Sequence, residues 1–122
     1  MTKHRIKIKP LSINQAWAGR RYKTPKYKAY RERCQWLLKP CDIPEGDLWL
    51  QLEFGVSNMA FDLDNGLKPF IDALQDKYGF NDNRITALTA TKTKVAKGSE
   101  YIDWSITDVT AFNEFMDAIS DT

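Results

Sequence analysis

The chain has 122 residues, of which 43% are hydrophobic and 28% are charged, and its formal net charge is +2. These values exclude an intrinsically disordered chain and are typical of one domain with a hydrophobic core. No apolar run approaches the roughly 20 residues that span a bilayer, and no signal-peptide pattern opens the sequence. The sequence therefore predicts one domain over residues 1–122, without a membrane partner.

Cysteine and histidine are too few for a structural zinc site. The chain contains Cys34, Cys41 and one histidine, His4, with no CxxC pair. Structural zinc needs four such ligands. Two unpaired cysteines favour a reduced, cytoplasmic setting.

Charge is distributed unevenly along the chain. Residues 1–40 hold twelve of the eighteen Lys and Arg residues and one acid, for a net +11. The remaining residues hold six bases and fifteen acids, for a net −9. The basic third indicates a polyanionic partner and the acidic remainder indicates a cation site, although charge that only keeps the protein soluble is the alternative.

The basic third begins with a short strand and a loop. Basic and apolar residues alternate over Arg5–Lys9, which predicts a half-buried strand ended by Pro10. Ser12–Tyr22 has the composition of a loop. It carries a basic cluster around an aromatic residue, formed by Arg20, Arg21, Tyr22 and Lys23. Such a cluster suits phosphate contacts and stacking, and a mobile charged loop is the alternative.

A helix is predicted over Pro25–Leu38. Thr24 is a good N-cap, proline is favoured at the first helical position, and Pro40 closes the element. The apolar stripe of this helix consists of Tyr27, Tyr30, Cys34, Leu37 and Leu38. Because Cys34 lies within that stripe, we interpret it as a core residue and not as a nucleophile.

Three further strands and a last helix follow. Alternation predicts a strand over Leu48–Val56, and two more runs, Ile85–Lys92 and Tyr101–Ile106, are separated by a turn at 94–99 that suggests a hairpin. Thr107 or Asp108 is expected to cap a helix whose apolar stripe is Val109, Phe112, Phe115, Met116 and Ile119. The predicted class is α+β, a mixed and mostly antiparallel sheet of about four strands with two or three helices.

The most informative stretch is Asp62-Leu63-Asp64, which opens a helix. Two carboxylates two residues apart in an extended turn lie on the same side of the backbone. Apolar residues at helical spacing follow, and Gly79 is the expected stop. If Asp64 or Asn65 is the N-cap, the proline at position 69 lies at the edge of the first turn, where it is tolerated.

A lysine and a third acid complete the pattern. Lys68 falls one turn after Asp64, and Asp82 follows in the loop that leaves the helix. Three carboxylates beside an ammonium group would suit a magnesium ion and a reacting phosphate. Each residue also has a structural explanation: an aspartate is a common N-cap, Lys68 can pair with Asp72 at i,i+4, and Asn81-Asp82-Asn83 is a turn sequence.

These residues resemble the RusA family of Holliday junction resolvases, small endonucleases of bacteria and their prophages. The resemblance is carried by Asp62-Leu63-Asp64-Asn65, Lys68-Pro69, Asp72-Ala73-Leu74, Gly79, Asp82 and Ile85, with Ser12-Ile13-Asn14 upstream. It covers roughly residues 5–106. Two positions depart from the family pattern: Phe61 stands where a basic residue is frequent, and Asn81 stands where a second acid is common.

The resemblance implies a homodimeric, magnesium-dependent endodeoxyribonuclease, in which manganese can replace magnesium and no small-molecule cofactor is used. It implies that Asp62, Asp64 and Asp82 hold the metal and that Lys68 is the catalytic lysine. We expect the following basic and polar residues to contact the four-way junction: Asn14, Arg20, Arg21, Lys23, Lys26, Lys28, Arg31, Lys92, Lys94 and Lys97.

Three other functions are compatible with the sequence. The same site could serve a nuclease for flaps or other branched DNA. The chain could be a branched-DNA-binding module that does not turn over. It could also be a metal-buffering or scaffold protein, which would show no salt-dependent affinity for DNA.

Overall fold

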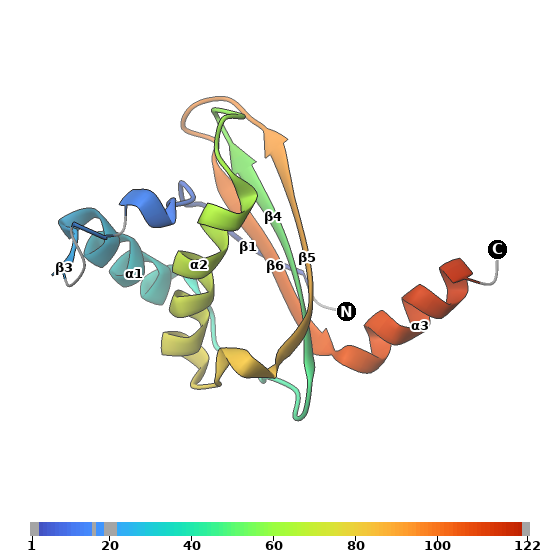
Figure 1. The fold of residues 1–122 in the computed structure, drawn as a ribbon. Coiled ribbons are helices and arrows are strands. Elements are labelled where there is room, and N and C mark those ends of the chain that lie inside the picture. Colours follow the sequence, from blue (N-terminus) through green and yellow to red (C-terminus); the bar gives the residue numbers. More distant parts are fainter. Residues whose placement is uncertain (1–2, 16, 19–21, 121–122) are drawn as a thin grey trace.

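The computed structural model describes residues 3–15, 17–18 and 22–120 of the chain. In chain order its elements are β1 (His4–Ile6), η1 (Ile13–Gln15), β2 (Trp17–Ala18), β3 (Tyr22–Lys23), α1 (Pro25–Leu37), β4 (Leu48–Val56), α2 (Leu63–Tyr78), η2 (Asp82–Arg84), β5 (Ile85–Lys94), β6 (Tyr101–Asp108) and α3 (Val109–Ser120) (Figure 1). None of the helices in these ranges has the length and apolar character needed to cross a bilayer.

A four-stranded mixed sheet forms the centre of the molecule, with strand order β1-β6-β4-β5. β4 pairs parallel with β5 and antiparallel with β6, and β6 pairs antiparallel with β1. The described residues also contain a separate two-stranded sheet, β2-β3. The predicted α+β class, with a mixed and mostly antiparallel sheet and three helices, is confirmed.

The predicted hairpin between β5 and β6 is wrong. The two strands are joined by a short turn, but β4 lies between them in the sheet and pairs with both. The cause is the parallel β4–α2–β5 unit, which brings β5 to one side of β4 and leaves the other side for β6. Trp49 is buried as well as Leu48 and Leu50, because its ring packs against Phe112 and Phe115 on the other face of β4.

The two long helices begin and end at residues with clear capping signals. The Thr24 side chain accepts a hydrogen bond from the Tyr27 amide at the start of α1, which confirms that prediction. The C-cap of α2 is Gly79, in the left-handed region at φ 71°. Glycine adopts this positive φ without strain because it has no Cβ.

The N-cap of α2 is Asp62, two residues earlier than Asp64 and three earlier than Asn65, the expected caps. Pro69 therefore lies inside the helix and not at the edge of its first turn. Proline inside a helix costs about 3 kcal/mol. Complete burial of Pro69 and Phe70 in the core offsets this cost, because apolar burial contributes about 2 kcal/mol per large side chain.

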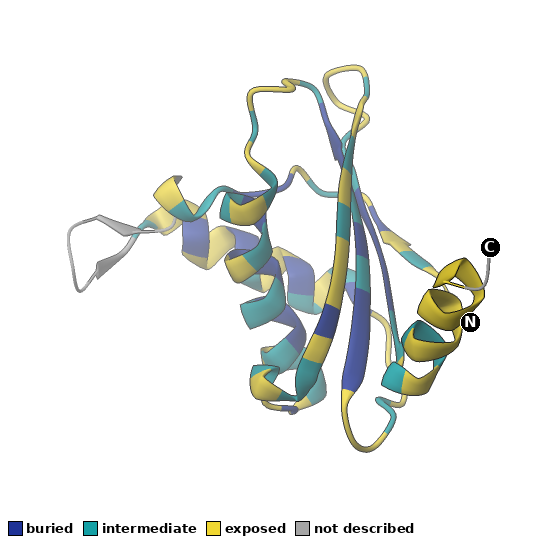
Figure 2. Ribbon diagram, turned by 45° about the vertical axis from the view of Figure 1, so that its right-hand side comes forward, coloured by how far each residue is buried: buried dark blue, intermediate teal, exposed yellow. Residues whose placement is uncertain are grey.

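Helices α1 and α2 cover one face of the sheet, and the core lies between these layers (Figures 1 and 2). Its fully buried members include Tyr27 and Cys34 of α1, Phe54 of β4 and Phe70 of α2. Burial raises the pKa of the Cys34 thiol to about 12. Cys34 is thus a core residue, as predicted.

The N-terminal segment has more local structure than its sequence indicates. The first strand is His4–Ile6 and not Arg5–Lys9, because β6 offers partners only to His4, Arg5 and Ile6. The stretch 12–22, predicted as loop, contains η1 and the two-residue strand β2, and β3 begins at its last residue. Elements this short are stabilised by their tertiary surroundings and carry little sequence signal.

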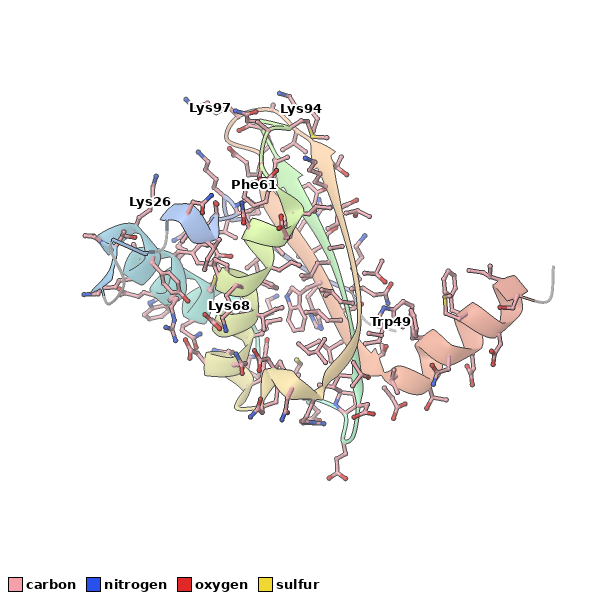
Figure 3. All side chains as sticks on the ribbon, viewed as in Figure 1. Lys26, Trp49, Phe61, Lys68, Lys94 and Lys97 are labelled. Atoms are coloured by element: carbon pink, nitrogen blue, oxygen red, sulfur yellow. The ribbon has the colours of Figure 1, made fainter. Side chains whose placement is uncertain are left out.

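Helix α3 leaves the sheet and projects away from α1 and α2 (Figure 1). Asp108 caps it, accepting a hydrogen bond from the Thr110 amide at 2.7 Å. Trp49, labelled in Figure 3, packs against the rings of Phe112 and Phe115 at centroid distances of 5.3 and 6.1 Å. The predicted apolar stripe is only partly covered, since Phe115, Met116 and Ile119 are between 43% and 53% exposed.

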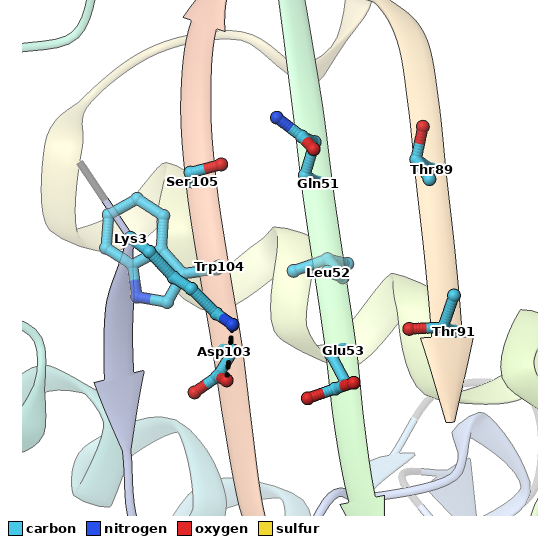
Figure 4. Close-up of a pocket in the computed structure, with 9 residues that line it drawn as sticks. All are labelled: Lys3, Gln51, Leu52, Glu53, Thr89, Thr91, Asp103, Trp104 and Ser105. Carbon is cyan, nitrogen blue, oxygen red and sulfur yellow. Dashed lines mark ion pairs between the residues drawn. The ribbon is translucent and has the colours of Figure 1, made fainter. Parts of the chain in front are cut away.

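The sheet face opposite α1 and α2 carries polar side chains (Figure 4). Glu53 and Asp103 lie directly opposite each other on β4 and β6. Arg5 donates two hydrogen bonds to the buried Asp103 carboxylate, at 2.6 and 2.9 Å, and Lys3 lies 3.3 Å from it. The guanidinium of Arg5 lowers the pKa of Asp103 below its ordinary value.

We expect Arg5→Gln to lower the free energy of unfolding at pH 7, because it leaves a buried carboxylate without its two hydrogen bonds from the guanidinium. The pKa of Asp103 is depressed in the folded protein, so the ion pair contributes stability above the unfolded pKa of about 3.9 and loses it as the pH falls through the folded pKa. Urea unfolding of the wild type and the variant from pH 7 to pH 3 measures both effects. A difference that stays constant with pH would contradict this assignment, and exposed Lys7, changed to Gln, is the control.

Candidate functional site

The acidic motif lies where β4 ends and α2 begins. Residues 57–62 connect the two elements, Asp62 is the N-cap of α2, and Asp64 is in its first turn. Both aspartates are exposed. The Asp62 side chain makes no capping bond and instead accepts a hydrogen bond from Asn65 Nδ2 at 3.3 Å. The positive end of the helix dipole stabilises both ionised carboxylates.

Two lysines of β5 hold the loop that precedes the motif. Lys92 Nζ donates to the carbonyl oxygens of Met59 and Phe61, each at 2.8 Å, and Lys94 Nζ donates to the carbonyl of Ser57. The parallel register that places Lys92 and Lys94 beside the end of β4 makes these bonds possible. Lys92 and Lys94 were expected to contact DNA; in this structure their ammonium groups bind the protein's own backbone.

Phe61 fixes the same loop from the side of the helix. Its ring packs against Phe54 at a centroid distance of 5.8 Å. It also covers Gly66 so closely that a Cβ on Gly66 would lie 2.5 Å from the ring. Gly66 is therefore required by close packing, and Phe61, the departure from the family pattern, has a structural role at this position.

Lys68 lies among acidic side chains from two elements. Its Nζ is 2.8 Å from Asp72 Oδ1, one turn further along α2, and 3.8 Å from Asp82 Oδ2 on η2. The hydrogen bond to Asp72 and the charges of Asp72 and Asp82 raise the pKa of Lys68 above its ordinary value. The predicted lysine and the predicted third acid are thus brought together.

Two residues that the sequence did not indicate complete this cluster. Tyr27 Oη of α1 donates to Asp72 Oδ2 at 2.7 Å. Gln75 accepts from the Asp82 amide at 2.9 Å and reaches Asp72 Oδ1 at 3.4 Å, which fixes η2 against α2. From the sequence, Asp72 is a helical i,i+4 partner of Lys68 and part of the family pattern, without a role at the site. No sequence signal links Tyr27 to it, since they are 45 positions apart and meet only when α1 packs on α2.

The three predicted ligands do not form a metal cage in this arrangement. Within residues 3–15, 17–18 and 22–120, no group of three or more His, Cys, Asp or Glu side chains is placed to hold a metal ion. Helix α2 is 16 residues long, about 24 Å, and separates the loop that carries Asp62 from the one that carries Asp82. Carboxylate oxygens are ligands that magnesium prefers. The Asp82 carboxylate, however, lies beside Lys68.

Besides Lys92 and Lys94, the residues expected to contact DNA fall into three groups. Asn14, Lys26, Lys28 and Lys97 are exposed. Arg31 is paired with Asp76 of α2, with Nε donating to Oδ2 at 2.7 Å. Arg20 and Arg21 lie outside the described residues, as does the side chain of Lys23. In the view of Figure 3, Lys26, Phe61, Lys94 and Lys97 lie toward the upper end of the molecule.

A hollow on the polar sheet face lies away from the acidic motif. A cavity of about 320 Å³ opens on the polar sheet face and includes Gln51, Glu53, Thr89 and Asp103 (Figure 4). None of the motif residues lines it. Asp62 and Asp64 are themselves exposed, so they are accessible to a large substrate such as duplex DNA.

Comparison with known proteins identifies a family for this chain. A family model described as endodeoxyribonuclease RusA matches residues 2–102, which include the acidic motif, Lys68 and Asp82. The match ends before α3. A search of curated proteins finds no match to the chain.

We expect Lys92→Met to loosen the loop that carries the acidic motif without unfolding the sheet, since the variant keeps the aliphatic stem and removes both bonds to the loop carbonyls. Hydrogen exchange of the amides of residues 57–62 should accelerate, while exchange in β4 stays unchanged. Lys97→Met, in the exposed turn between β5 and β6, is the matched control. Equal exchange in the two variants would show that Lys92 does not hold the loop.

Proposed function

The chain belongs to the RusA endodeoxyribonuclease family, and on that premise we propose that it resolves four-way (Holliday) junctions by paired nicks in a divalent-metal-dependent reaction. The family establishes a nuclease, and the choice of substrate and metal is the proposal. The enzyme would act on DNA in the cytoplasm of a bacterium or of a phage-infected cell, in recombination and repair.

One observation carries the proposal. The ammonium group of Lys68 lies 3.8 Å from the Asp82 carboxylate, although the two residues belong to different elements. A cation beside a carboxylate on exposed surface can receive a phosphate on one side and a water molecule on the other. This pairing supports the roles that the family resemblance assigns to Lys68 and Asp82.

Asp62, Asp64 and Asp82 are the residues that would hold the metal, magnesium or manganese. When bound, such an ion polarises a phosphate oxygen and lowers the pKa of a bound water. The fit is partial, as described above, because Asp82 is engaged by Lys68 while Asp62 and Asp64 lie at the start of α2. No geometry of the ion is therefore assigned.

The chain's own residues account for the rest of the reaction. Water adds to phosphorus and the bond to the 3′ oxygen breaks, which leaves a 5′-phosphate and, after proton transfer to the leaving oxygen, a 3′-hydroxyl. Negative charge increases on the phosphoryl oxygens at the transition state, and the protonated Lys68 neutralises it or orients the attacking water. Lys68 is charged at neutral pH, since the ordinary pKa of lysine already lies well above 7 and the neighbouring carboxylates raise it further.

Binding of the junction would involve the basic surface and a second subunit. The exposed side chains of Lys26, Lys28 and Lys97, with Asn14, would contact phosphates. The proposed contacts also include Arg20, Arg21, Lys23, Arg31, Lys92 and Lys94. A two-fold homodimer with one active site per subunit matches the two-fold symmetry of a four-way junction, so that paired nicks follow from symmetry.

The test is cleavage of a synthetic mobile junction with magnesium. We expect the wild type to introduce paired nicks that EDTA abolishes. We expect Asp62→Asn, Asp64→Asn and Lys68→Ala each to lower the nicking rate by about 10²–10³-fold, because the two aspartates would hold the metal and Lys68 acts at the reacting phosphate, while junction binding stays intact. Binding without nicking under several divalent ions would identify a non-catalytic module, and faster cleavage of flaps than of junctions would identify a flap nuclease.

The salt dependence of binding tests the electrostatic surface. If about six phosphates are neutralised, log affinity should fall with log salt concentration at a slope near −5. Lys26→Gln and Lys28→Gln should each make the slope less steep by about 0.9. Affinity measured between low and moderate salt checks this. A slope near zero would contradict a DNA-binding role altogether.

A further inference from the structure

The Lys68 side chain is held more firmly than its position on the helix explains. Lysine has a long, flexible stem, and this side chain is 56% exposed. A lysine followed by an aspartate at i+4 is the weaker order of such a pair, so the helix alone would leave the ammonium group free to move. In the structure Lys68 Nζ nevertheless lies 2.8 Å from Asp72 Oδ1.

Asp72 is fixed from outside its own helix. Its other oxygen, Oδ2, accepts a hydrogen bond of 2.7 Å from Tyr27, a fully buried residue of α1. Its Oδ1 is also approached by Gln75 Nε2 at 3.4 Å. The carboxylate therefore has one oxygen anchored to the core and the other directed at Lys68, which makes it a rigid acceptor.

This anchoring decides where the ammonium group lies. Pairing with Asp72 turns the Lys68 side chain along α2 toward η2, where Asp82 Oδ2 is 3.8 Å away. Asp82 is itself fixed by the bond from its amide to Gln75. Without the contact to Asp72, the exposed lysine would distribute over several rotamers, and only some of them approach Asp82.

We infer that Asp72, anchored by the Tyr27 hydroxyl, is the positioning residue that holds the catalytic lysine Lys68 beside Asp82. The inference rests on the proposed function, because it takes Lys68 as the group that acts on the phosphate. Asp72 does not touch the substrate in this scheme. It acts only by restricting Lys68, which increases the fraction of molecules ready for reaction.

The alternative is that Asp72 only links α1 to α2. The structure offers a matched control for this, since Asp76, one turn further along α2, pairs with Arg31 of α1. Asp76 makes the same kind of link between the same helices, away from Lys68. Asp72→Asn is the informative change, because its amide oxygen can still accept from Tyr27 while the charge that attracts Lys68 is removed.

The first measurement does not depend on activity. Lys68 Nζ lies 2.8 Å from Asp72 Oδ1, and this contact restricts the side chain. In Asp72→Asn we expect the Lys68 side chain to become more mobile, followed by NMR relaxation of the Lys68 ¹³Cε resonance at neutral pH. Asp76→Asn should leave this relaxation in place. Unchanged Lys68 relaxation in Asp72→Asn would overturn the inference.

The second measurement is a double-mutant cycle on the single-turnover nicking rate at saturating junction. We expect Asp72→Asn to lower this rate about tenfold while its affinity for the junction stays within twofold of the wild type. Tyr27→Phe should lower the rate severalfold. The rate of Asp76→Asn should stay within twofold of the wild type. In the Lys68→Ala background, Asp72→Asn should cause no further loss, because the residue through which it acts is absent. Manganese can be used to raise the residual rate of that background to a measurable level.

The outcomes separate the two proposals. If Lys68→Ala nicks like the wild type, the catalytic role of Lys68 and the positioning role of Asp72 are both overturned. If Lys68→Ala is defective and Asp72→Asn is not, the proposed function stands and the positioning role is overturned. If Asp72→Asn causes the same tenfold loss in both backgrounds, Asp72 is a structural link only.

Discussion

The parallel pairing of β4 with β5 determines the rest of this structure. Parallel neighbours need a crossover, and α2 supplies it, so that the helix runs back along the sheet between the two strands. The start of α2 is therefore placed at the end of β4, and η2 is placed at the start of β5. The acidic motif and Asp82 come from opposite ends of the same helix for this reason, and Lys68, from within the helix, lies beside Asp82.

Local signals in the sequence were sufficient to predict where the helices and strands lie. They were not sufficient to predict which strands pair with each other. Thr24, Asp108 and Gly79 mark helix ends as predicted, and β4 has the bounds that its alternation indicates. The β5–β6 hairpin was wrong, because a short connection between two strands says nothing about a third strand that pairs between them. The predicted start of α2 was too late because it assumed that Pro69 must lie near the helix end. In the structure the burial of Pro69 outweighs its low helix propensity.

At the site, too, the sequence identifies individual residues but not the contacts that hold them. The family pattern identified Lys68 and Asp82, and the structure brings them together. The anchor of Asp72 by Tyr27 depends on how α1 packs against α2, which neither helix encodes alone. The sequence also does not show which lysines are free to bind DNA. Lys92 binds loop carbonyls, whereas Lys28 is exposed. The bonds of Lys92 depend on the register of β5 against β4.

The half-covered α3 has a consequence for how the protein loses structure. Twelve residues is a length at which a helix without tertiary support is marginal in water. Its contact with the sheet is concentrated near its beginning, around Trp49, while Phe115, Met116 and Ile119 are substantially open to solvent. The last turns of α3 therefore form a separate cooperative unit, which melts before the sheet and exposes little additional apolar surface when it does so.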